Sequence, residues 1–167
     1  MKTFRWCLVV LLAGGAWAAE KFTPEQLAAR YYFDLGPAAI DVSSYPAEHK
    51  KAYESFAHEC ADCHTLARPI NAPFVERKDW SRYVTRMHLR HRLKSGSGFS
   101  KAEGKAIVDF LAYDSKIRKI QGKANFEAEG EKLKVLFEDV KKEKLKLIEA
   151  DNHKKAKTRE QAPAPGQ

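Results

Sequence analysis

The chain has 167 residues and carries 30 Lys or Arg against 22 Asp or Glu, which gives it a net charge of +8. This basic balance favours an acidic partner surface. Nucleic acid is not the expected partner, because the chain begins with an export signal and contains no nucleic-acid-binding motif.

The N-terminus has the features of a signal peptide over residues 1–18. Lys2 and Arg5 precede an apolar run, and Ala16-Trp17-Ala18 is an A-x-A cleavage site. The apolar run is too short to cross a bilayer, which needs about 20 apolar residues. Cleavage removes Cys7 and two basic residues, so the mature chain has a net charge of +6 and two cysteines. We therefore expect a periplasmic protein without a disulfide framework.

Residues 19–45 form an N-terminal extension. Thr23, Pro24 and Gln26 have the spacing of a helix N-cap, first helical residue and capping-box partner. The sequence predicts a short helix to about Asp34, stopped by Gly36-Pro37. Its aromatic residues favour an extension that covers the next domain, and a helical arm that binds a partner is the alternative.

The segment Cys60-Ala-Asp-Cys63-His64 is the most informative motif. C-x-x-C-H is the attachment signature of a c-type haem. The two thiols add to the two vinyl groups of one haem, and the imidazole that follows approaches the iron as the proximal ligand. A bare C-x-x-C is shared by redox dithiols and zinc sites, but the adjacent His and the export signal favour haem c.

Residues 46–120 are predicted to form the haem domain, with three helices. The first runs from about Ala47 to Ala61 and delivers the cysteines. A loop follows over residues 65–74, and a second helix extends from an Asp79 N-cap to about Leu93. Ser100 then caps a third helix, with Glu103 as its capping-box partner. A core of this size is marginal, and a buried haem would complete it.

Few side chains are available as the sixth iron ligand. Met87 is the only methionine after signal cleavage, and it shares a helix face with Trp80, Tyr83, Val84 and His91. A thioether or an imidazole is the usual ligand. We therefore expect Met87 as the ligand, with His91 or His88 as the alternative, or an open position.

Two further residues are predicted to serve the haem. Trp80 would pack against it or donate a hydrogen bond to a propionate. Pro69 would lend its carbonyl group to the second nitrogen of His64, a contact that orients a ligand ring. His58 is expected at the surface or beside a propionate.

These residues resemble those of the small class I c-type cytochromes. The likeness covers residues 46–120 and is carried by C-x-x-C-H, by the loop from Thr65 to Asn71, by Trp80-x3-Val84-x2-Met87 and by the helix after Ser100. The resemblance implies that the helix ending at C-x-x-C-H is crossed by the last helix of the domain, and that a methionine between them takes the sixth position. The Trp-Val-Met segment is similar to haem domains of several bacterial oxidoreductases and photosynthetic reaction-centre cytochromes.

The C-terminal part has a different composition. Residues 121–152 are rich in Lys and Glu, with an apolar stripe that predicts a long surface helix. This helix either docks on its own haem domain or forms a homodimer or partner contact. Residues 153–167 are basic and then rich in Ala and Pro, and they are predicted to be disordered. The predicted fold is thus all-α.

The leading functional hypothesis is a periplasmic single-haem electron carrier rather than an enzyme. A haem protein that binds a small ligand at iron, or a haem subunit of a larger oxidoreductase complex, is the alternative. Basic residues follow the motif and favour an acidic redox partner, although a solvated helix face explains them as well. They are Arg77, Lys78, Arg82, Arg86, Arg90, Arg92 and Lys94.

Overall fold

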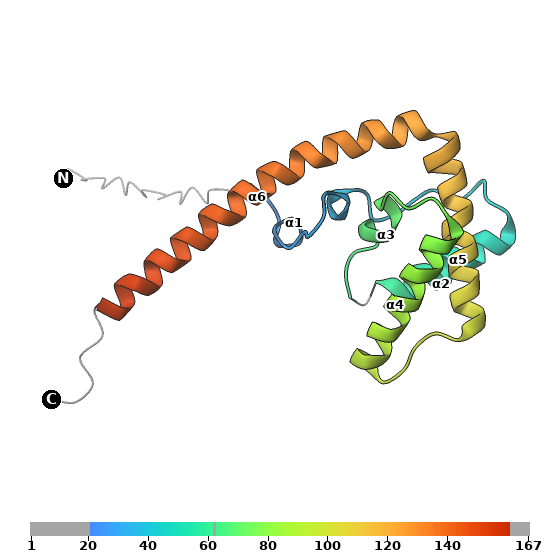
Figure 1. The fold of residues 1–167 in the computed structure, drawn as a ribbon, viewed down its shortest axis with the longest axis horizontal. Coiled ribbons are helices and arrows are strands. Elements are labelled where there is room, and N and C mark those ends of the chain that lie inside the picture. The colour runs from blue at the N-terminus through green and yellow to red at the C-terminus, as the bar shows by residue number, and fades with distance from the viewer. Residues whose placement is uncertain (1–20, 62, 161–167) are drawn as a thin grey trace, which may run out of the picture.

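The computed structural model describes residues 21–61 and 63–160, and within these ranges the fold is all-α, as predicted. None of the described helices is long and apolar enough to cross a membrane. The predicted signal peptide lies outside the described residues. The elements in chain order are α1 (Pro24–Leu27), η1 (Tyr32–Leu35), α2 (Ala47–Cys60), α3 (Ala67–Asn71), α4 (Arg77–Ser95), α5 (Lys101–Ser115), η2 (Lys116–Gln121) and α6 (Lys123–Glu160) (Figure 1).

The N-terminal arm, residues 23–38, begins as predicted but does not stay helical. Thr23 and Gln26 form the expected capping box of α1, which ends at Leu27. Asp34 explains the early end, because its carboxylate accepts hydrogen bonds from the backbone N–H groups of Arg30 at 2.8 Å and Tyr31 at 3.2 Å. Such local bonds to the backbone compete with continuation of a helix. The arm therefore breaks into α1 and the short η1.

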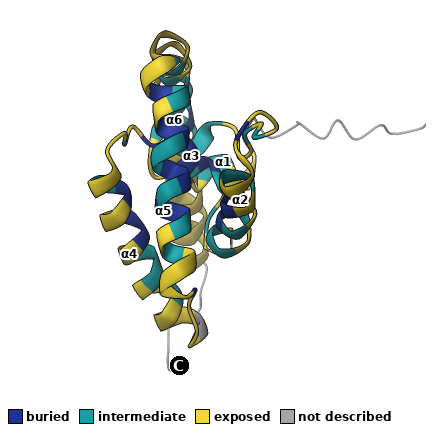
Figure 2. Cartoon of the chain, turned by 90° about the vertical axis from the view of Figure 1, so that its right-hand side faces the viewer, coloured by how far each residue is buried: buried dark blue, intermediate teal, exposed yellow. Residues whose placement is uncertain are grey.

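Three helices enclose the hydrophobic core. Helix α5 packs against both α2 and α4, and the buried residues of α4 and α5 lie on facing sides (Figure 2). Phe56, Trp80 and Phe110 have no exposed surface. Phe56 and Phe110 bring their ring centroids to 5.5 Å, which places α2 directly on α5.

The bounds of α4 and α5 follow their capping residues. Ser100 and Glu103 form the predicted capping box of α5. Helix α4 starts earlier than predicted, with Glu76 at the N-cap, whereas Asp79 lies in the first turn. An acidic residue in the first turn is favourable there, because the helix dipole is positive at that end. Gly96 ends α4 with a φ of 73°, a left-handed conformation that suits glycine.

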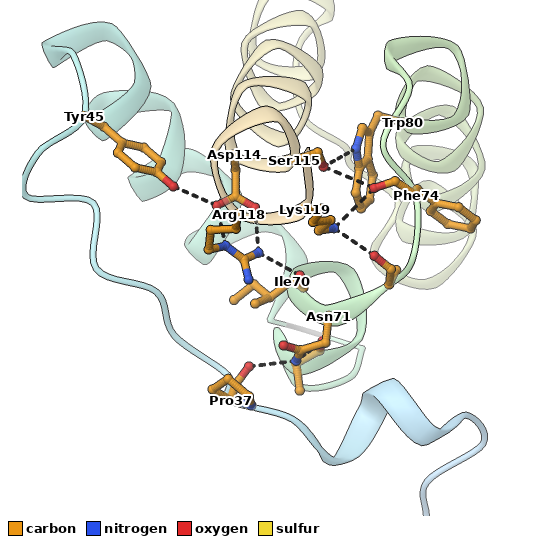
Figure 3. A network of polar contacts seen from close by, with 12 residues as sticks. Pro37, Tyr45, Ile70, Asn71, Phe74, Trp80, Asp114, Ser115, Arg118 and Lys119 are labelled. Carbon is orange, nitrogen blue, oxygen red and sulfur yellow. Dashed lines mark hydrogen bonds and ion pairs between the residues drawn. The ribbon is translucent and has the colours of Figure 1, made fainter. Parts of the chain in front are cut away.

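The predicted loop after the motif contains the short helix α3, which a buried polar network joins to η2 (Figure 3). Arg118 donates from Nη2 to the carbonyl of Ile70 at 2.8 Å. It also forms two bonds with Asp114, which accepts a third from the Tyr45 hydroxyl at 2.9 Å. Lys119 donates from Nζ to the carbonyls of Ala72 and Phe74, at 2.8 and 3.3 Å. These bonds give hydrogen-bond donors to the carbonyl groups of Ile70 and Ala72, while the Phe74 carbonyl also accepts from the Ser115 hydroxyl at 3.2 Å.

Helix α6 extends away from the body after the π-helical segment η2 (Figure 1). Its first half packs on η1 and α1, and Val140 is buried there. It ends at Glu160, beyond the point where a disordered tail was predicted to begin. Good helix formers and an ion pair of 2.6 Å between Lys155 and Asp151 support these added turns.

The buried Lys119 makes stability depend on pH. Burial lowers the pKa of Lys119 to about 7, while its unfolded value is near 10.4. Between these values the unfolded chain binds more protons than the folded one, so stability rises with pH. Relative to Lys119→Met, the native free energy of unfolding should rise by about 2 kcal/mol from pH 7 to 9, since one pKa unit is about 1.4 kcal/mol.

Chemical denaturation at a series of pH values measures this difference. Lys116→Met is the matched control, because Lys116 is exposed in the same segment. Equal pH slopes for the native chain and Lys119→Met would contradict the prediction.

Candidate functional site

One cavity of about 610 Å³ brings together four of the predicted site residues. Cys60, Cys63 and His64 line it from the end of α2 and the turn that follows, and Met87 lines it from α4. The N-terminal arm supplies nine of the 21 lining residues and so forms a wall of its own. The motif, the candidate sixth ligand and the N-terminal extension therefore surround the same space.

His64 is oriented by the backbone next to it. Its Nδ1–H donates to the carbonyl of Thr65 at 2.9 Å. A carbonyl only accepts, so the proton lies on Nδ1 and the lone pair of Nε2 is available to a metal. Burial lowers the pKa of His64, which favours the neutral imidazole that coordination needs.

The two cysteines of the motif form no disulfide and lie in different surroundings. Cys60 is the last residue of α2, is partly buried and packs against the hydrophobic core. Burial raises the pKa of the Cys60 thiol to about 12, with Glu59 and Cys63 adding to the effect. Cys63 is exposed, and Nζ of Lys94 lies 4.0 Å from its Sγ.

The helical register of α4 separates the candidate sixth ligands. Tyr83, Met87 and His91 follow one another at intervals of four residues and all line the cavity. His88 lies on another face, where it lines a second cavity of about 500 Å³ and packs edge-on against Phe99. Met87 and His91 thus remain as candidates that reach the cavity, and His88 does not line it.

Trp80 and Pro69 differ from their predicted roles. The indole N–H of Trp80 donates to Ser115 Oγ at 2.9 Å, and Trp80 is fully buried in the core rather than at the cavity. Lys119 Nζ lies 4.7 Å from the ring centroid of Trp80.

Pro69 is buried in α3, and His64 Nδ1 bonds to the Thr65 carbonyl instead of to the Pro69 carbonyl. The Thr65 carbonyl belongs to the next residue, so His64 Nδ1 reaches it without the chain having to fold back from Pro69. His58 is exposed and bonds to Glu59.

Tyr83, which had no predicted role, has a buried hydroxyl without a hydrogen-bond partner among residues 21–61 and 63–160. Tyr83 is 8% exposed and lines the cavity. An unpartnered buried hydroxyl costs about 1–3 kcal/mol, so it indicates a group that binds there. Its place one turn before Met87 was the only sequence signal.

The lining has the chemistry that haem c requires. A volume of about 610 Å³ lies within the range of about 300–1,000 Å³ for small-molecule and cofactor sites. Two thiols, an imidazole with a free Nε2 and a thioether line the cavity, and the Tyr83 hydroxyl offers a polar contact. Within residues 21–61 and 63–160, no cluster of three or more His, Cys, Asp or Glu could hold a metal ion.

Comparison with known proteins found no matching family model, no matching curated protein and no matching solved structure.

The unequal exposure of the thiols predicts unequal reactivity. When both cysteines are free, a thiol reagent at neutral pH should modify the exposed Cys63 at least about tenfold faster than Cys60, since access and thiolate fraction control the rate. Mass spectrometry of Cys60→Ser and Cys63→Ser assigns each rate to one thiol. Equal rates in the two variants would contradict the described packing of Cys60.

Proposed function

We propose that this protein is an exported, single-haem c-type electron carrier. The observation that carries the proposal is the shared cavity, which is lined by both cysteines of C-x-x-C-H, by His64 and by Met87. Cys60 and Cys63 would attach the haem, and His64 and Met87 would be its axial ligands. The haem would supply reversible one-electron exchange between the ferric and ferrous states of its iron.

The chain's own residues position and shield this group. The Thr65 carbonyl fixes the His64 ring through Nδ1, so that Nε2 is the ligating atom. Met87 packs against the hydrophobic core from α4, which limits its movement. A methionine with a histidine leaves no open position and raises the reduction potential, as an electron carrier requires.

The basic residues of α4 provide a surface for an acidic redox partner. Arg90 lines the cavity, and the charge of Arg86 acts on Tyr83, which also lines it. Lys94 contacts Cys63. Positive charge from α4 therefore lies beside the cavity, where a partner must approach for electron transfer. A membrane oxidoreductase complex is an alternative partner, and the exposed Leu145, Leu147 and Ile148 of α6 keep a complex or homodimer contact open.

A second candidate function is binding of a small ligand at the iron. The buried hydroxyl of Tyr83 favours it, because such a donor can stabilise a polar ligand inside the cavity. This function requires an open or weakly held sixth position. The identity of the sixth ligand therefore decides between the two functions.

Covalent haem is the first test of the proposal. The mature protein, produced in an exporting host with haem attachment, should gain the mass of one haem and keep its colour after acid-acetone extraction. The double variant Cys60→Ala, Cys63→Ala should lose both properties, because the thioether bonds can no longer form. Extractable haem, or zinc in its place, would contradict the proposal.

The axial ligands are tested by paired variants on one face of α4. The oxidised protein should show a methionine-to-iron charge-transfer band in the far red, and Met87→Ala should abolish it. His88→Ala is the matched control and should leave the band unchanged, because His88 lines the other cavity. Loss of the low-spin spectrum in His91→Ala, with Met87→Ala unaffected, would indicate two histidine ligands. No effect of either variant would favour the small-ligand function.

The arginines of α4 predict a salt-dependent reaction rate. Electron transfer with an acidic redox protein should slow as salt rises, because exposed charges are screened beyond about 10 Å at 0.1 M salt. Reversing Arg86 and Arg90 to Glu should flatten this dependence. The pair Lys142→Glu, Lys155→Glu changes the net charge equally on α6 and should retain it. An electron-transfer rate that does not depend on salt would contradict the prediction. The basic residues of α4 would then be only a solvated helix face.

A further inference from the structure

The N-terminal arm is attached to the element that follows the motif. Asp34 of the arm forms a two-bond ion pair with Arg68 of α3, with both distances 2.7 Å. The side chains are 7% and 21% exposed. The Asp34 carboxylate also accepts hydrogen bonds from the backbone N–H groups of Arg30 and Tyr31. One side chain thus shapes the arm and fixes it to α3.

A second contact lies one turn further along α3. Asn71 donates from Nδ2 to the Pro37 carbonyl of the arm at 3.0 Å and to the Ala67 carbonyl of its own helix at 2.7 Å. Gly36 allows this close approach, because a Cβ atom at this position would lie 2.5 Å from the Nδ2 atom of Asn71. Side chains at i and i+3 of α3, Arg68 and Asn71, therefore hold the arm from the same helix face.

Helix α6 supports the arm from the other side. It packs on η1 and α1. Lys134 Nζ of α6 lies 5.5 Å from the ring centroid of Tyr32 in η1. The arm is consequently held between α3 and α6. On the cavity side it presents five small or apolar residues and four polar or charged ones. The first are Ala28, Ala29, Leu35, Gly36 and Ala38, and the second are Glu25, Gln26, Arg30 and Asp34.

We infer that the N-terminal arm is a wall that closes the haem cavity and sets the reduction potential by excluding water. The Asp34–Arg68 ion pair and the close contact of Gly36 with Asn71 keep this wall in place. This inference rests on the proposed function. A wall that covers a redox centre limits the access of solvent to it, and this changes its potential. Opening the arm would admit water, which favours the more highly charged ferric state and lowers the potential.

Two variants open the wall by different physical means. Asp34→Asn removes the charge that holds Arg68, and Gly36→Ala places a methyl group against Asn71. Asp41→Asn is the control for the first, because Asp41 accepts a local hydrogen bond from the backbone N–H of Ser43, two residues away. Gly130→Ala is the control for the second, since a Cβ atom there meets nothing within 4 Å.

The experiment uses the full-length, haem-loaded proteins and two measurements. Trypsin cleavage after Arg30 reports release of the arm, and redox titration reports the potential of the haem. Asp34→Asn and Gly36→Ala should both be cleaved at least about tenfold faster than the native protein. Loss of the ion pair, or a methyl group that clashes with Asn71, favours local opening of the arm. Both should also have a lower potential with the axial-ligand spectrum retained, while both controls behave like the native protein.

The outcomes separate this inference from the function on which it rests. Faster cleavage with an unchanged potential would overturn the wall, because the arm would then be attached without shielding the haem. Unchanged cleavage and unchanged potential in both opening variants would overturn the roles of Asp34 and Gly36. A native protein without covalent haem would overturn the proposed function itself.

Discussion

The structure depends on donors for the buried carbonyl groups that follow the C-x-x-C-H motif. A helix as short as α3 leaves carbonyls without partners, and burial makes an unpaired carbonyl costly. Arg118 and Lys119 of η2 supply the donors, and Asp114 balances the charge of Arg118. Helix α3, which follows the turn that carries His64, is therefore joined to η2, far away in the sequence (Figure 3).

The same short helix links the cavity to the rest of the chain. Its Arg68 and Asn71 side chains hold the N-terminal arm, while the backbone carbonyls of Ile70 and Ala72 are bound by η2. The arm in turn covers part of the apolar stripe of α6. The N-terminal arm thus lines the cavity, and the first half of the long charged helix α6 supports the arm.

Local patterns were sufficient to predict α2, α4, α5 and the start of α1, but they could not predict α3 or how distant residues pair. Capping boxes at Thr23 and Ser100 were recognisable because their partners lie three residues away. The arm was expected to remain helical to Asp34, but Asp34 accepts hydrogen bonds from the backbone N–H groups of Arg30 and Tyr31. Its ion pair with Arg68, 34 residues away, has no local signal in the sequence. Trp80 was assigned to the haem because tryptophan suits such contacts, yet Ser115, which is distant in sequence, receives its N–H.

The central claim is that the cavity beside C-x-x-C-H holds a haem iron between His64 and Met87. X-ray diffraction from crystals of the mature protein, recorded on both sides of the iron absorption edge, tests it most directly. The account predicts one anomalous iron peak in this cavity, with electron density from the haem continuous to Sγ of Cys60 and of Cys63. An iron peak elsewhere, or a metal other than iron bound by the two thiols, would contradict it.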